Sequence, residues 1–101
     1  MAIALIMKFE NDGRDVLGLY DQANAAMHTV DTPPEGLVMH WAAKTESGGL
    51  CVVDVWASRE QFDRFFAQKL GPTAQQLGLP QPNIEEFSVY NVIDGRVPSA
   101  T

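Results

Sequence analysis

Residues 36–57 alternate in a way that predicts two β-strands joined by a Gly-rich turn. A period of two places every second side chain on the same face of a sheet, and the odd-numbered positions of the two strands, on either side of the turn, are all apolar. The even-numbered positions mix apolar side chains with His40, Lys44 and Asp54. We therefore expect the odd face to pack under helices and the even face to form a ligand site. The predicted odd face consists of Leu37, Met39, Trp41, Ala43, Cys51, Val53 and Val55.

Residues 1–9 and 83–93 predict the two remaining strands. In the first of them the odd positions, from Ile3 to Phe9, are apolar, whereas Lys8 falls on the even face. This parity is the one seen in the hairpin, so we expect Lys8 on the same face as His40. The first strand ends at an Asn-Asp-Gly cluster, which favours a turn.

Two segments show the spacing of amphipathic helices. Residues 14–28 carry apolar side chains three and four positions apart, including Tyr20. In the second segment Ser58 and Gln61 form a capping-box pattern, and Gly71-Pro72 should break the helix before a short piece at residues 73–77. The expected buried stripe of the second helix is Phe62, Phe65, Phe66 and Leu70.

The resulting order, β-α-β-β-α-β, predicts an α+β protein with the ferredoxin-like fold, in which both helices cover one face of a four-stranded antiparallel sheet. We expect residues 1–93 to form a single domain and residues 94–101 to be a flexible C-terminal tail. The other sheet face would be bare and largely apolar. A second copy stacking on it would give a homodimer with a cavity between the two sheets.

The composition of the chain argues against several classes of binding partner. A formal charge of -6 without a cluster of Lys or Arg disfavours nucleic acid and anionic membranes. The single cysteine, Cys51, excludes an internal disulfide and favours a reducing compartment, so we expect a cytoplasmic protein. Two histidines and one cysteine are too few for a closed zinc site, and we expect no bound cofactor or metal.

Residues 54–62, Asp-Val-Trp-Ala-Ser-Arg-Glu-Gln-Phe, lead from a strand through an aromatic side chain into a capped helix. In this segment and in its element order over residues 1–93, the chain resembles the dimeric α+β barrel superfamily. That superfamily includes cofactor-independent antibiotic biosynthesis monooxygenases, haem-degrading enzymes and proteins like muconolactone isomerase. The resemblance implies a ferredoxin-like fold, a homodimer and a cavity for a small molecule.

His40 and Asp54 are the predicted centre of the site. If the two hairpin strands pair in even register, the two side chains are neighbours and can share a hydrogen bond. A carboxylate that accepts one imidazole N–H leaves the other ring nitrogen free to act as a base. The predicted substrate contacts around this pair are Trp56, Tyr90, Lys8, Val38 and Val52.

These residues leave several functions open. One is a cofactor-independent monooxygenase or an isomerase acting on an aromatic or lactone-like molecule, with His40 as base and Asp54 as its orienting group. Another is a binding or assembly module without turnover, in which the pair only stabilises an interface. A weaker third possibility is haem binding through His40.

Overall fold

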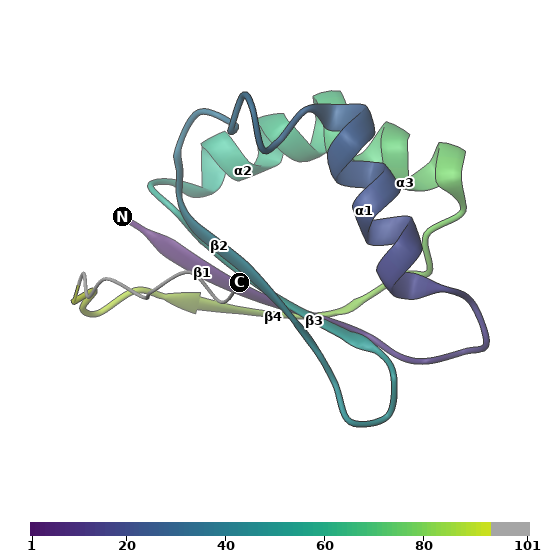
Figure 1. The fold of residues 1–101 in the computed structure, drawn as a ribbon. Coiled ribbons are helices and arrows are strands. Elements are labelled where there is room, and N and C mark those ends of the chain that lie inside the picture. Colours follow the sequence, from purple (N-terminus) through teal and green to yellow (C-terminus); the bar gives the residue numbers. More distant parts are fainter. Residues whose placement is uncertain (94–101) are drawn as a thin grey trace.

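The computed structural model describes residues 1–93, which fold in the predicted order β-α-β-β-α-β, with the second helical segment in three consecutive parts (Figure 1). The strands are β1 (Ile3–Phe9), β2 (Leu37–Lys44), β3 (Leu50–Trp56) and β4 (Asn83–Ser88). The helical segments are α1 (Val16–Met27), α2 (Arg59–Phe65), a π-helical turn (Phe66–Leu70) and α3 (Gly71–Leu77).

The four strands form one antiparallel sheet in the order β2-β3-β1-β4. All helical segments lie over the same face of this sheet, and no described element covers the other face (Figure 1). The predicted ferredoxin-like α+β fold is therefore confirmed. Two βαβ crossovers that share a central hairpin produce this arrangement.

The predicted assignment of the hairpin faces is wrong. In the β1–β3 ladder Ile3 pairs with Trp56 and Met7 with Val52, so odd residues of β1 share a face with even residues of β3. Because residues paired directly across antiparallel strands point to the same side, the even residues of β3 lie under the helices. The odd residues of β3, including Cys51, line the bare face instead.

A register shift between Leu37 and Met39 also alters β2. Leu37 pairs with Trp56 and packs toward the helices, whereas beyond the shift the even residue His40 pairs with Asp54. Trp41 therefore lies on the bare face, opposite Val53, and it is 47% exposed. One extra residue in a strand moves all later side chains to the other face, which is the effect of a β-bulge.

The core under the helices consists of two clusters. One gathers Ile3, Leu5 and Phe62 around Trp56, which is completely buried. The other lies near the opposite end of β1 and β3 and consists of Met7, Val16, Leu50 and Val52. Aromatic contacts strengthen the first cluster, since Trp56 meets Phe62 edge to face at a centroid distance of 5.5 Å.

The second helical segment begins as predicted, because the Ser58 side chain accepts a hydrogen bond from the Gln61 amide. The predicted break at Gly71-Pro72 is absent, and the helical segment continues through these two residues. The amide of Gly71 donates to the Phe66 carbonyl five residues back, and this wider π turn leads directly into α3. Pro72 follows this π turn at the first positions of α3, where proline is tolerated.

The chain ends differ in part from the prediction. Strand β4 stops at Ser88, five residues short of the expected end, and residues 89–93 belong to no helix or strand. The predicted flexible tail, residues 94–101, lies outside the described residues. None of the helices within residues 1–93 has the length and apolar character needed to cross a membrane.

Candidate functional site

A cavity of about 480 Å³ lies between the helices and the sheet. Its wall includes members of both core clusters, such as Val52 and Trp56, and side chains of α1 and of the connection that follows it. Close-packed protein interiors leave few voids larger than a water molecule, and 480 Å³ is within the usual range for small-molecule sites. The cavity that the two core clusters line therefore has room for an organic ligand.

The predicted hydrogen bond between His40 and Asp54 is present. Nδ1 of His40 lies 2.5 Å from Oδ1 of Asp54, and the two residues face each other across the β2–β3 ladder. The Asp54 side chain is 7% exposed and that of His40 is 31% exposed. Both residues line the cavity under the helices, however, and not a cavity on the bare sheet face.

Asp54 is a buried carboxylate with a donor on each oxygen. Besides His40 on Oδ1, the indole Nε1–H of Trp56 donates to Oδ2 over 3.2 Å. Burial of a carboxylate is costly unless such hydrogen bonds compensate for lost water. With both donors in place, the carboxylate is fixed in position and directs the Nδ1–H of His40 toward itself.

Tyr20 completes this network and was not predicted as a site residue. Its hydroxyl lies 2.5 Å from Nε2 of His40, and the two rings are within 5° of parallel. Since Nδ1 of a neutral His40 donates to Asp54, Nε2 is the acceptor and the Tyr20 hydroxyl is the donor. The apolar spacing of α1 had placed Tyr20 in a core stripe. A buried phenol needs a hydrogen-bond partner, so the presence of Tyr20 in an apolar stripe was the signal that could have indicated a polar contact there.

The pKa of Tyr20 is raised above its ordinary value of 10.0, chiefly because burial disfavours the phenolate. A hydrogen bond from the Asn24 side chain acts in the opposite direction, and the negative charges of Asp54 and Asp21 raise the pKa further. Burial is the largest of these effects. At neutral pH Tyr20 is therefore a phenol with its proton available to His40.

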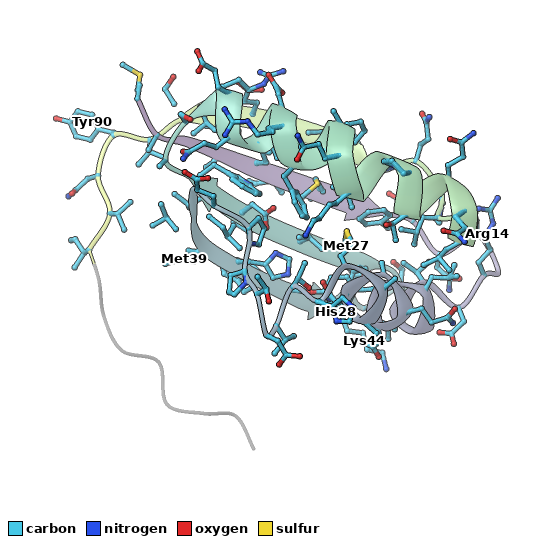
Figure 2. All side chains as sticks on the ribbon, turned by 90° about the horizontal axis from the view of Figure 1, so that it is seen from above. Arg14, Met27, His28, Met39, Lys44 and Tyr90 are labelled. Carbon is cyan, nitrogen blue, oxygen red and sulfur yellow. The ribbon has the colours of Figure 1, made fainter. Side chains whose placement is uncertain are left out.

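The other predicted contact residues divide into two groups. Val52 and Trp56 lie buried in the cavity wall, and Val38 lies in the wall but is largely exposed. Lys8 pairs with Cys51, so it belongs to the bare face, on the side of the sheet opposite His40. Tyr90 follows β4, is fully exposed and projects away from the domain (Figure 2). Neither Lys8 nor Tyr90 lines the cavity.

Within residues 1–93 no three side chains of His, Cys, Asp or Glu come together as a metal site would require. Figure 2 looks onto the helices and shows Met27, which contributes to the cavity wall, between the two helical segments. The polar groups of the cavity are thus concentrated in Tyr20, His40 and Asp54, with Asn24 and Thr29 nearby on the α1 side.

Comparison with solved structures identifies the fold. SnoaB, a cofactor-independent oxygenase from Streptomyces nogalater, matches 93% of this chain and 98% of its own, with a TM-score of 0.70 for one variant and 17% identity. Rv0793 from Mycobacterium tuberculosis matches with a TM-score of 0.71 and 15% identity, and the match covers 93% of this chain and 100% of Rv0793. The chain shares the fold of these proteins.

A third similar structure is a candidate antibiotic biosynthesis monooxygenase from Chloroflexus aurantiacus, with a TM-score of 0.67, 13% identity and coverage of 93% and 98%. The predicted resemblance to the dimeric α+β barrel superfamily is thus confirmed at the level of fold. No family model and no curated protein matches the chain.

Proposed function

We propose that this protein binds a small apolar organic molecule in the cavity under its helices and removes a proton from it, with His40 as base and Asp54 as the group that orients His40. The observation that carries this proposal is the hydrogen-bonded His40–Asp54 pair in the wall of a 480 Å³ cavity. An imidazole held by a carboxylate in the wall of a ligand pocket is suited to general base catalysis.

The shape and lining of the cavity favour an aromatic or lactone-like substrate. Val52 and Trp56 offer apolar and flat surfaces, and the polar side chains Tyr20, His40 and Asp54 are joined by hydrogen bonds. Proton removal from such a molecule gives a carbanion or enolate. An electron-rich carbanion can transfer electrons to molecular oxygen and become oxygenated, whereas protonation at a different atom gives an isomer. Fold similarity to SnoaB, a cofactor-independent oxygenase, supports the first outcome.

We further propose a homodimer formed through the bare sheet face. Met39, Trp41 and Phe87 on this face are 39%, 47% and 48% exposed, which is unusual for side chains so large and apolar. A second copy related by a two-fold axis would cover this surface on both subunits. In this arrangement each subunit keeps its own cavity on the helical side of its sheet.

A passive binding module is the second candidate. It is favoured by the fact that both ring nitrogens of His40 already have partners, Asp54 and Tyr20, as in a purely structural network. The same fact disfavours haem. An axial histidine ligand needs a free nitrogen, and on His40 neither is free in this arrangement, so the residues present do not fit haem ligation through His40.

A probe that reports proton removal separates the enzyme from the binding module. Nitrobenzisoxazole is a flat, apolar molecule that is converted to a coloured phenolate when a base takes its ring proton.

Binding of this probe is measured separately, by saturable quenching of Trp56 fluorescence in a Trp41→Phe background, because Trp56 is then the sole tryptophan and lies in the cavity wall. The proton-removal rate of the protein should fall at least about tenfold in His40→Ala and in Asp54→Ala.

Two results would overturn parts of this proposal. Saturable binding with equal rates in wild type, His40→Ala and Asp54→Ala would exclude catalysis by the pair and favour the binding module. Absence of saturable quenching would contradict a cavity that accepts flat organic molecules. Circular dichroism of each variant checks that the fold persists.

A further inference from the structure

The hydroxyl of Tyr20 occupies the nitrogen through which His40 would act as a base. Nε2 has one lone pair, and the Tyr20 hydroxyl lies 2.5 Å from it. Nδ1 is engaged by Asp54 at the same distance. A substrate proton can therefore reach His40 by only two routes: the substrate displaces Tyr20, or the proton travels through the phenol.

Displacement is opposed by the way Tyr20 is held. It lies in the middle of α1, and its ring packs against the core cluster that contains Met7 and Val16. Moving the hydroxyl away from Nε2 would require this half-buried ring to leave its packing. The hydroxyl also lies within hydrogen-bond distance of Nε2, and the Tyr20 and His40 rings are within 5° of parallel, so the two groups are close enough for proton transfer between them.

Asn24 is the second polar neighbour of the phenol. It lies one helical turn after Tyr20 in α1, where residues four apart are neighbours. Its Oδ1 accepts a hydrogen bond from the Thr29 hydroxyl over 2.6 Å, which leaves its amide nitrogen to act as donor. A hydrogen bond from this side chain to Tyr20 lowers the phenol pKa, against the raising effect of burial. The Tyr20 oxygen thus has an orienting donor and still keeps acceptor capacity toward the cavity that it lines.

We propose that Tyr20 is the catalytic residue that contacts the substrate, and that it relays the substrate proton to His40. This inference rests on the proposed function of the site. In the step, the substrate C–H bond breaks and its proton joins the Tyr20 oxygen, while the original Tyr20 proton passes to Nε2. The products are a substrate anion, a neutral Tyr20 and an imidazolium ion paired with the Asp54 carboxylate, so protons and charge balance.

A solvent isotope measurement tests the relay on the unaltered protein. The ring C–H of nitrobenzisoxazole does not exchange with water, whereas the hydroxyl of Tyr20 does. If His40 takes the proton directly, no exchangeable proton moves in the chemical step and the rate in D2O should match that in H2O. If Tyr20 relays the proton, its deuterium moves in that step and the wild-type rate should be lower in D2O. Equal rates in the two solvents would overturn the relay.

Tyr20→Phe supplies the second test, with Tyr90→Phe as the matched control that removes the other, fully exposed tyrosine. The relay predicts that Tyr20→Phe loses at least about tenfold of the His40-dependent rate and that its remaining rate shows no solvent isotope effect. Tyr90→Phe should behave as wild type. An unchanged or raised rate in Tyr20→Phe would mean that Tyr20 only blocks Nε2, and would overturn the relay.

The two proposals fail in different ways. If wild type and His40→Ala remove the proton at the same rate, the proposed function itself fails. If the rate depends on His40 but not on Tyr20, only the relay fails. Nitrogen chemical shifts of the His40 ring give a readout that does not need turnover: Tyr20→Phe should shift the Nε2 signal and leave Nδ1 in its hydrogen bond with Asp54.

Discussion

His40 and Asp54 face each other across the β2–β3 ladder, with Nδ1 of the imidazole 2.5 Å from Oδ1 of the carboxylate. Trp56, two residues after Asp54 on the same face, donates to the second carboxylate oxygen. One buried carboxylate thus connects the edge strand β2, which carries the partly exposed imidazole, to the most deeply buried aromatic side chain of the core. Its removal should affect stability as well as any reaction.

Asp54→Ala should lower the free energy of unfolding by about 1–3 kcal/mol, because it leaves the buried indole N–H of Trp56 without an acceptor. The midpoint of urea unfolding, followed by circular dichroism, measures this change. Asp63→Ala is the matched control: it removes an exposed carboxylate that pairs with Arg59, and such pairs contribute at most about 1 kcal/mol. Equal losses in the two variants would contradict the stabilising role assigned to the Asp54 network.

The raised pKa of Tyr20 predicts a loss of stability in alkaline solution. Its phenol ionises near 10.0 in the unfolded chain and at higher pH in the folded protein, so above about pH 10 the unfolded state binds fewer protons than the folded state. Stability from this group is therefore complete below pH 10 and declines as the pH rises toward the folded pKa. Urea midpoints at successive pH values measure the decline.

Tyr20→Phe should make this alkaline decline shallower, since it removes the group whose pKa differs between the two states. Tyr90→Phe, which removes the exposed phenol, should leave the decline in place. Ultraviolet titration gives an independent check, because the absorbance step that appears latest on raising the pH should be absent from Tyr20→Phe. Its persistence in that variant would show that burial of Tyr20 is not the cause.

The order of elements and the pairing of His40 with Asp54 were predictable because they depend on local signals. Turn residues, helical spacing and even register within one short hairpin suffice for both. The face of the sheet on which the pair lies was not predictable in the same way. In β3 both parities are apolar apart from Asp54, and a lone carboxylate in such a strand suggests an open face.

The structure shows why that inference fails. Asp54 is buried because two donors, His40 and Trp56, satisfy it, and hydrogen bonds of this kind are invisible to periodicity. Trp41 shows the reverse case: it is apolar, yet it lies on the uncovered face of the sheet. The pairing offset between β1 and β3 decides the question, and it depends on long-range contacts that a pattern within one strand does not encode. Tyr20 was missed for the same reason, since its partner is twenty residues away on another element.

Gly36 should be sensitive to substitution because its backbone has a φ of +92° and a Cβ there would lie 2.7 Å from the Cβ of Gln61. Gly36→Ala should therefore destabilise the protein through both backbone strain and a clash at the entry to β2, by about 1–3 kcal/mol. Gly78→Ala is the matched control, since Gly78 has a φ of +72° but open space around it. A larger loss of urea midpoint for Gly36→Ala isolates the clash, and equal losses would contradict it.

Trp41 provides the sharpest test of the proposed dimer. It is 47% exposed on the bare face, and large aromatic side chains commonly dominate the free energy of an interface. A glutamate at this position would place a charge between two apolar sheets. Trp41→Glu should weaken the dimer by about 2 kcal/mol or more, which corresponds to a dissociation constant raised by about thirtyfold.

Sedimentation velocity over a range of protein concentrations measures this dissociation constant. The control is Val30→Glu, which adds the same charge at a residue that is 83% exposed but lies in the connection between α1 and β2, on the helical side of the sheet. This variant should remain as dimeric as wild type. A monomeric wild type, or a Trp41→Glu variant that dimerises as tightly as Val30→Glu, would show that the bare face is not the interface. Since the cavity lies on the other side of the sheet, monomeric Trp41→Glu should still bind the nitrobenzisoxazole probe.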